Sequence, residues 1–259
     1  MSDRSPSTTT TTRRARREAE RRAARTTPAK RSAGRSPVVW ITVAAIVAGV
    51  IFLAVLIVAN QPSDSLGLTP PSDPTPTEQA DGRSVGATDA PATLEVWADF
   101  QCPSCGVFSR SAEARLIREY VSDGRLRIVF KDFAFIGDES TEAAVAARAA
   151  QAQGQFWPYH DWLFANQDGE NKGGFRREVL VGIAKEIGLD VPAFEAALDD
   201  SALAEDVRTE TASASAVPVS ATPTLVIGDQ VFTGVPAWDT LAAAVEAEIA
   251  KGSGASATP

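Results

Sequence analysis

The chain has 259 residues, a formal net charge of −8, two cysteines and a single histidine. Two cysteines leave no second sulfur pair, which excludes a disulfide-stapled scaffold. A structural zinc site needs four ligands, and His160 is the one histidine that could join Cys102 and Cys105, so zinc is disfavoured and no metal is expected. The sequence also lacks a G-x-S-x-G motif, a P-loop and a dinucleotide fingerprint.

The net charge conceals a strong asymmetry along the chain. Residues 1–37 hold 11 Lys and Arg against three acidic residues, whereas residues 60–259 hold 14 basic and 30 acidic residues. Between them, residues 38–59 (VVWITVAAIVAGVIFLAVLIVA) carry no charge, and 22 residues at about 1.5 Å each can cross a hydrocarbon core of about 30 Å. Because basic flanks stay in the cytoplasm, we predict one membrane-spanning helix with a cytoplasmic N-terminus and an extracytoplasmic remainder.

Two alternatives bear on this N-terminal region. A cleaved signal peptide has a shorter apolar region and a small-x-small cleavage site, and Ile57 fits that site poorly. We therefore predict an uncleaved anchor in the cell membrane. The basic tail could also bind nucleic acid, but Arg-rich runs beside a spanning helix more often set orientation and contact anionic lipid, so no nucleic-acid partner is expected.

Residues 60–90 are rich in Pro, Ser, Thr, Asp and Gly and nearly devoid of large apolar residues, which predicts a disordered linker. Residues 91–251 are long enough for one domain with its own core, and residues 252–259 are predicted to be a flexible tail. Within the domain we predict a strand over 93–100, a helix from Cys102 to about 122 that is ended by Asp123-Gly124, and a strand over 125–133. A helical block over about 138–217, a hairpin over 224–233 and a covering helix over 237–250 complete a mixed α/β domain.

The two cysteines form the sequence Cys102-Pro103-Ser104-Cys105 at the predicted junction of strand and helix. The unpaired N–H groups and the dipole of a helix start stabilise a thiolate, which predicts Cys102 as the accessible nucleophile. Cys105, one turn further on, is predicted to be the more buried resolving thiol. This pattern favours redox chemistry carried by the chain itself, without a cofactor.

Three motifs resemble the DsbA-like branch of the thioredoxin superfamily, the membrane-anchored or lipid-anchored thiol-disulfide oxidoreductases of bacteria. They are ADFQCPSC at 98–105, GQFWPYHDWLFANQ at 154–167 and SATPTLVIG at 220–228. The resemblance spans residues 91–250 and implies a thioredoxin-like fold with an inserted helical subdomain. It also implies that Pro223 is a cis-proline facing the disulfide and that Thr222 offers backbone hydrogen bonds to a substrate chain.

The chain departs from this family's pattern at a buried acid. Many relatives carry Glu six residues before the first cysteine, where this chain has Val96, with Glu95 one place earlier. Because neighbouring residues of a strand face opposite sides, we expect Glu95 to lie away from the site. Asp99 is the better candidate for tuning the site, with a loop or cap carboxylate as the alternative. His160 is expected to be a core residue rather than a catalyst.

The inner pair Pro103-Ser104 bears on the direction of exchange. The resemblance implies Pro-His in strongly oxidising members, whereas a Ser hydroxyl supplies one neutral hydrogen bond and no positive charge. We therefore predict a potential between the about −120 mV of strong oxidants and the about −270 mV of thioredoxin.

The predicted function is insertion of disulfides into cysteine-containing unfolded proteins of the envelope. The implied reoxidising partner is a quinone-linked membrane oxidase of the DsbB or vitamin K epoxide reductase type. The alternatives are a reductase or isomerase, for example in cytochrome c maturation, and a non-catalytic or copper-handling module, although copper sites usually use a C-x-x-x-C spacing.

Overall fold

The computed structural model describes residues 37–59 and 66–255. The chain divides into two units, Met1–Ser63 and Asp64–Pro259. In the first unit, α2 (Pro37–Ala59) is helical where the membrane-spanning helix is predicted, and its described side chains, those of residues 40–53, are exposed. Among the residues that the structure describes, none of the helices is long and apolar enough to cross a membrane. Residues 1–36 of the predicted basic tail, residues 60–65 of the predicted linker and residues 256–259 of the predicted flexible tail lie outside the described part.

The second unit is built on a six-stranded sheet with the strand order β1-β2-β4-β3-β5-β6. The two central strands, β3 and β4, run parallel, and every other neighbouring pair is antiparallel. β3 supplies the fully buried Leu94 and Val96, which explains why a run of β-forming residues lies at the middle of the sheet. The strands are β1 (Ala80–Asp81), β2 (Ser84–Val85), β3 (Ala92–Ala98), β4 (Leu126–Asp132), β5 (Thr224–Ile227) and β6 (Gln230–Thr233).

A helical run crosses from β3 to β4, as the sequence predicted. It consists of α3 (Pro103–Phe108), η1 (Ser109–Glu113), α4 (Ala114–Leu116) and η2 (Ile117–Val121), with π-helical turns in η1 and η2. Gly124, with a φ of 72°, then reverses the chain, and Arg125 N–H donates to the carbonyl of Tyr120 at 2.9 Å. This left-handed conformation is the one that glycine adopts without strain, so the Asp123-Gly124 stop signal acted as expected.

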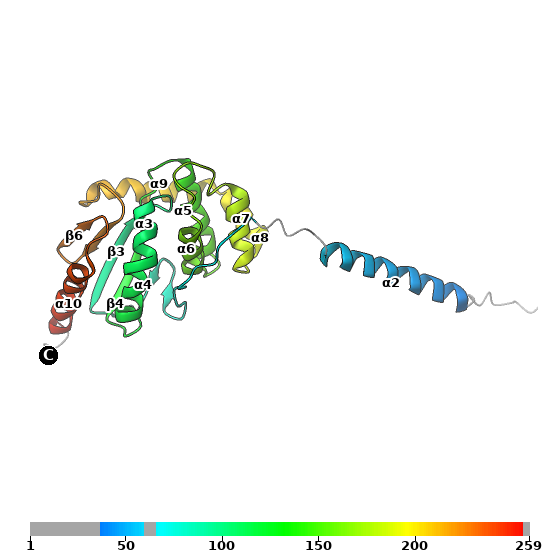
Figure 1. Ribbon diagram of the computed structural model, residues 1–259, viewed down its shortest axis with the longest axis horizontal. Coiled ribbons are helices and arrows are strands. Elements are labelled where there is room, and N and C mark those ends of the chain that lie inside the picture. The colour runs from blue at the N-terminus through cyan, green and yellow to red at the C-terminus, as the bar shows by residue number, and fades with distance from the viewer. Residues whose placement is uncertain (1–36, 60–65, 256–259) are drawn as a thin grey trace, which may run out of the picture. The chain divides into compact units, whose positions relative to one another are not determined.

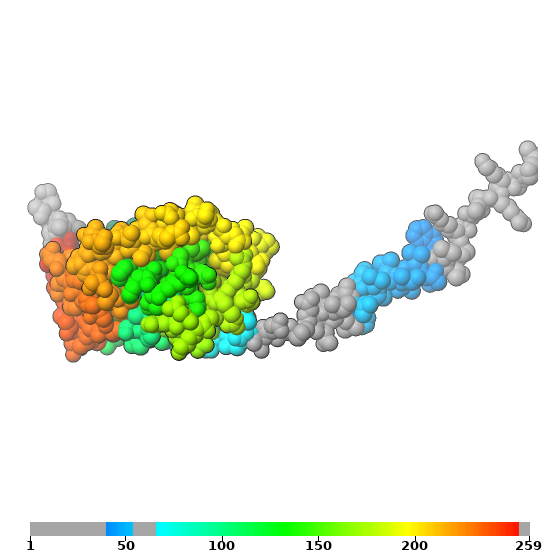
Figure 2. Space-filling view, turned by 90° about the horizontal axis from the view of Figure 1, so that it is seen from above, coloured from blue at the N-terminus to red at the C-terminus, as the bar shows by residue number. Residues whose placement is uncertain are grey.

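The predicted helical block is present between β4 and β5. Figure 1 shows α5 to α8 gathered beside the crossover helices, and Figure 2 shows the face on which α9, in yellow to orange, lies along the green residues of α5. The elements are α5 (Asp138–Gln151), α6 (Phe156–Ala165), α7 (Arg177–Glu186), α8 (Val191–Leu198), α9 (Ser201–Ser213) and η3 (Ala214–Ala216).

A buried ion-pair network fastens this block to the sheet. Asp132, at the end of β4, is 1% exposed and lies 2.7 Å from Arg148 of α5 and 3.2 Å from Arg83. Glu210 of α9 accepts the backbone N–H of Asp132 at 3.0 Å and pairs with Arg148 at 2.9 Å. Strand β4, helices α5 and α9 and the turn that carries Arg83 thus meet at one group of two cations and two carboxylates.

The prediction of a disordered linker up to residue 90 is wrong for residues 66–90. Residues 66–79 form a segment, here called the strap, that lies on the helical block. Its backbone is bound by side chains of the α6 region: Thr75 N–H donates to Asp161 at 2.6 Å, and Thr69 N–H donates to Asn166 at 2.7 Å. β1 and β2 follow and pair with β4 through β2. Composition missed this order because the side chains that bind the strap's backbone, Asp161 and Asn166, lie about 90 residues later in the sequence.

The predicted flexible tail is also wrong for residues 252–255. The last helix, α10 (Trp238–Ala255), continues beyond the predicted end at residue 250. A Cβ at Gly252 would lie 2.1 Å from the carbonyl oxygen of Pro91, so the helix backbone approaches the start of β3 closely there. Glycine permits that approach.

Candidate active site

Cys102 and Cys105 lie at the start of the crossover helix, directly after β3. Cys102 is the N-cap of α3 with φ −68° and ψ 119°, and Pro103 occupies the first turn, where its missing N–H costs nothing. Gly106 N–H donates to the Cys102 carbonyl at 3.2 Å, which closes the first turn. Both cysteines are free thiols, and Cys102 at 8% exposure is more accessible than Cys105 at 1%.

The two thiols differ sharply in acidity. The pKa of Cys102 is lowered from 9.0 to about 6, first by a hydrogen bond from Cys105 and against the effect of burial. The Thr222 side chain and the backbone N–H groups of Ser104 and Cys105 lower it further. Burial raises the pKa of Cys105, and its bond to the Cys102 sulfur adds to that rise. The pair therefore holds one thiolate on Cys102 beside one protonated donor, Cys105.

The loop before β5 closes the other side of the site. The Thr222–Pro223 peptide bond is cis, and Cys102 Sγ lies 3.4 Å from the carbonyl oxygen of Thr222. The carbonyl of Pro223 accepts the N–H of Gly234 at 2.7 Å, which ties this loop to the end of β6. Residues 120 positions apart in sequence thus meet at the reactive sulfur.

Three other predicted residues occupy different positions. Asp99 is buried, and its carboxylate accepts Gln101 N–H at 2.8 Å, Phe135 N–H at 2.9 Å and the Ser140 hydroxyl at 2.7 Å. It therefore organises the loops around the site, which corresponds to the loop-carboxylate alternative. Glu95 lies on the other face of β3, 3.8 Å from Lys131, as the register argument predicted. Ser104 is exposed and contributes its backbone N–H to the Cys102 thiolate.

The sequence profile of the family described as Thioredoxin matches residues 78–247. The chain belongs to the thioredoxin family. It is 30% identical to the probable disulfide bond formation protein D of Bacillus anthracis over 173 residues, and this alignment covers 65% of this chain and 79% of that protein. The structure of oxidised BdbD from Bacillus subtilis superposes with a TM-score of 0.61 at 24% identity, covering 70% of this chain and 100% of BdbD.

A further relative has a different context. The Na⁺/H⁺ antiporter NhaA of Herminiimonas arsenicoxydans is 35% identical over 165 residues, which make up 62% of this chain and 25% of the antiporter. The structure of alpha-DsbA1 from Wolbachia pipientis superposes with a TM-score of 0.60 at 17% identity, covering 66% of this chain and 91% of that chain. Together with the disulfide bond formation protein D and these structures, the site identifies this chain as a DsbA-like thiol-disulfide oxidoreductase.

Several polar residues of this oxidoreductase site received no role from the sequence. Gln167, just after α6, donates to the carbonyls of Phe100 at 2.7 Å and Cys102 at 3.0 Å. Asn171 N–H donates to the side chain of Gln101 at 2.6 Å. Gln167 is the last residue of the GQFWPYHDWLFANQ motif, so a signal was present, but the spacing in sequence could not show that this motif reaches the cysteines.

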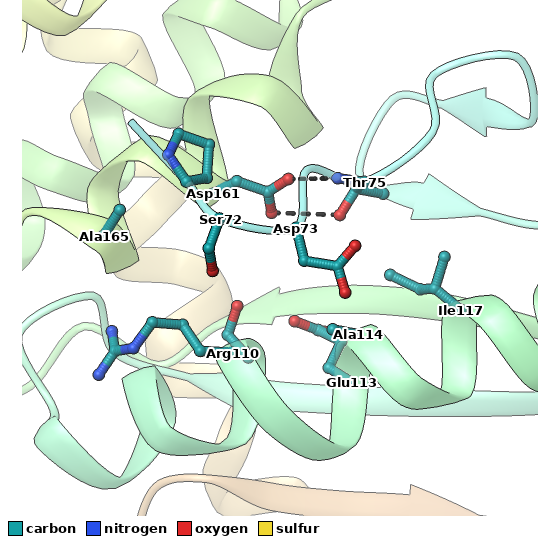
Figure 3. A pocket seen from close by; sticks show the side chains of 11 residues that line it. Ser72, Asp73, Thr75, Arg110, Glu113, Ala114, Ile117, Asp161 and Ala165 are labelled. Carbon is teal, nitrogen blue, oxygen red and sulfur yellow. Dashed lines mark hydrogen bonds between the residues drawn. The ribbon is translucent and has the colours of Figure 1, made fainter. Parts of the chain in front are cut away.

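A second buried polar group lies away from the sulfurs. His160 is surrounded by aromatic rings, as the core assignment predicted, and its Nδ1 lies 2.8 Å from Asp161. Its Nε2 lies 3.6 Å from Glu113, which is 2% exposed. Figure 3 shows the adjoining pocket, which Asp161 and Glu113 line together with Asp73 and Thr75 of the strap. Within the described residues, no group of three or more His, Cys, Asp or Glu side chains could hold a metal ion.

Proposed function

We propose that this oxidoreductase is a disulfide-forming oxidase that acts on secreted and envelope proteins. The observation that carries the proposal is the low pKa of Cys102, about 6, beside a protonated Cys105. A substrate thiolate attacks Cys102 Sγ of the disulfide form, the intramolecular S–S bond breaks, and Cys105 leaves as a thiolate that takes up a proton. A second substrate thiolate then attacks the substrate sulfur of the mixed disulfide and displaces Cys102. The substrate loses two electrons and two protons. The cysteine pair gains both electrons, Cys105 takes up one proton, and the second proton passes to water because Cys102 remains a thiolate.

The same pKa sets the expected strength of the oxidant. At pH 7, ionisation of a thiol with a pKa of about 6 shifts the equilibrium between the disulfide and reduced forms about tenfold towards the reduced form. Thioredoxin, with a pKa near 7, gains about twofold, and DsbA, near 3.5, gains about 3,000-fold. A tenfold change corresponds to about 30 mV. Starting from about −270 mV for thioredoxin and about −120 mV for DsbA, these differences give bounds of about −250 and −190 mV for this chain. This range lies within the interval that Pro103-Ser104 predicted, and oxidation of substrates then requires an efficient reoxidising partner.

The membrane setting is part of the proposal. Residues 38–59 are proposed as an uncleaved anchor with the basic residues 1–37 in the cytoplasm and the acidic domain outside the membrane. The domain of the antiporter relative, joined to a membrane protein, supports a location at the membrane surface. Because the chain has no further cysteines, its electrons must pass to another protein, for which a quinone-linked membrane oxidase of the DsbB or vitamin K epoxide reductase type is proposed.

Trapping in intact cells tests the direction of exchange. Cys105→Ala removes the thiol that can displace a bound substrate from Cys102 within the pair, so mixed disulfides should persist on Cys102, whereas Cys102→Ala should trap none. Wild-type protein should be mainly oxidised in cells, and should become reduced when the membrane oxidase is deleted. A wild type that is mainly reduced with the oxidase present would instead indicate a reductase.

A separate labelling experiment tests the topology. A membrane-impermeant maleimide added to intact cells should label the single thiol of Cys105→Ala without permeabilisation. Labelling that requires permeabilised cells would place the domain in the cytoplasm and overturn the proposed localisation.

A further inference from the structure

Gln167, two residues after the end of α6, holds the backbone on both sides of Gln101. The Gln167 side chain uses one nitrogen, Nε2, to donate to the carbonyl oxygens of Phe100 at 2.7 Å and Cys102 at 3.0 Å. Phe100 is 1% exposed, and the Cys102 carbonyl is the acceptor that opens α3. A single carboxamide from the helical block thus binds the segment that carries the nucleophile.

The start of α3 leaves room for this contact. A Cβ at Gly106 would lie 2.0 Å from Gln167 Oε1, so the amide lies directly against the helix where residue 106 has no side chain. The φ of Gly106 is not left-handed, which means that space rather than backbone conformation favours glycine here. Gly106 and Gln167 are therefore complementary.

Neighbouring residues form further hydrogen bonds to the segment around Cys102. The Gln101 side chain accepts Asn171 N–H at 2.6 Å and donates to Ser140 at 2.9 Å. Arg110, one turn beyond Gly106, donates to the carbonyl of Phe164 at the end of α6. The end of α6 and the chain after it consequently hold the residue before Cys102, the carbonyl of Cys102 itself and the helix that follows.

We propose that Gln167 is a positioning residue for thiol-disulfide exchange, acting through the backbone of Cys102. By fixing the carbonyls of residues 100 and 102, it keeps the Cys102 sulfur between the N–H groups of α3 and the loop that contains Thr222. Loss of the two hydrogen bonds leaves the Phe100 carbonyl to find a new partner and the Cys102 carbonyl with the N–H of Gly106 alone, and the turn shifts in response. The N–H groups then align less well with the sulfur, and the thiolate loses stability. This role holds for either net direction of exchange, so it rests only on the oxidoreductase activity.

Gln167→Met in the full-length protein tests the proposal, because methionine keeps the length of the side chain and removes its donors. Gln153→Met is the matched control: Gln153 also bridges backbone groups, donating to the Asp190 carbonyl at 3.2 Å and accepting its N–H at 2.8 Å, away from the cysteines. In Gln167→Met, the midpoint of the pH profile for Cys102 alkylation should rise. The equilibrium constant with glutathione should shift about twofold to tenfold towards the disulfide form, the range expected for one neutral hydrogen bond. Gln153→Met should change neither.

Gly106→Ala provides a second route to the same displacement. The new methyl group should push the Gln167 amide away and raise the midpoint, and adding Gln167→Met should produce little further change because the interaction is already lost. An unchanged midpoint and glutathione equilibrium in both Gln167→Met and Gly106→Ala would overturn the proposal. A midpoint that changes equally in Gln153→Met would also overturn it, since general loosening of the fold would then be the cause. Trapping in cells, which reports the direction of exchange, is independent of these results.

Discussion

Replacing Cys105 by alanine should raise the pKa of Cys102. The hydrogen bond from Cys105 is the largest of the contributions that lower this pKa to about 6, whereas burial opposes them. The backbone N–H groups of residues 104 and 105 and the Thr222 side chain remain in Cys105→Ala. We therefore expect the Cys102 midpoint to rise by more than one pH unit and to stop short of 9.0, the ordinary value.

The magnitude determines which measurement is informative. At pH 7 a thiol with a pKa of about 6 is about 90% ionised, whereas one at 9.0 is about 1% ionised. The ionised fraction therefore differs about ninetyfold. A thiolate of lower pKa is also a weaker nucleophile, and with a Brønsted slope of about 0.4–0.5 its intrinsic reactivity is about 16-fold to 32-fold lower. Even a full return to the ordinary pKa would thus slow alkylation at pH 7 by only about threefold to sixfold. The midpoint of the pH profile is the sharper quantity.

The assay is the rate of iodoacetamide alkylation of reduced protein between about pH 4 and pH 9.5, followed by intact mass. In the wild type a single adduct on Cys102 should form with a midpoint near pH 6, because the raised pKa of Cys105 keeps that thiol protonated. Ser111→Ala, which removes an exposed hydroxyl on the same helical run, should leave the midpoint unchanged. A wild-type midpoint above pH 8, or equal midpoints in wild type and Cys105→Ala, would refute the reasoning.

Three further predictions concern stability. His160 has a raised pKa because, although burial lowers it, Glu113 and Asp161 raise it; its contribution is complete below about pH 6.5 and is lost as the pH rises through the higher folded-state value. In urea unfolding, the free energy of unfolding should therefore decrease as the pH rises above about 6.5, and it should decrease less steeply in His160→Gln. An equally steep decrease in both proteins would show that the imidazole is not involved. Thr75→Val should cost about 1 kcal/mol in urea and increase proteolysis within the strap, because it removes the 3.1 Å bond from Thr75 Oγ1 to Asp161; an unchanged cleavage rate would argue against the strap contact. Arg148→Met should cost about 3 kcal/mol or more, because it leaves the buried Asp132 with fewer cationic partners; a cost below about 1 kcal/mol would mean that Arg83 alone neutralises that carboxylate.

Local patterns anticipated much of the domain. Alternating and buried β-forming residues located β3 and β4, and the Asp123-Gly124 pair marked the end of the crossover helix. The strand-to-helix junction placed Cys102 at the start of the helix, and register placed Glu95 on the far face of the sheet. Each of these depends on residues close in sequence, which is why sequence reasoning was sufficient.

The strap and the polar partners around the site required the fold. Thr75 is ordered by Asp161, 86 positions later, and no property of the strap's own composition announces that partner. Asp99 was recognised as polar and near the site, but its task, joining the N–H groups of Phe135 and Ile136, depends on a loop from another strand. The acidity of Cys102 likewise depends on where Thr222 lies.

The amino-acid order by itself determined the reactive group and the secondary structure around it, because a C-x-x-C pair at a helix start needs only neighbouring residues to be recognised. The family of the domain followed from the resemblance of three separate motifs, each of which is also a run of neighbouring residues. The tertiary structure alone decided which carbonyls Gln167 binds, which groups surround the Cys102 sulfur and where the strap lies. Hydrogen bonds and burial depend on distances of a few ångströms between atoms, and those distances exist only after remote segments have packed together.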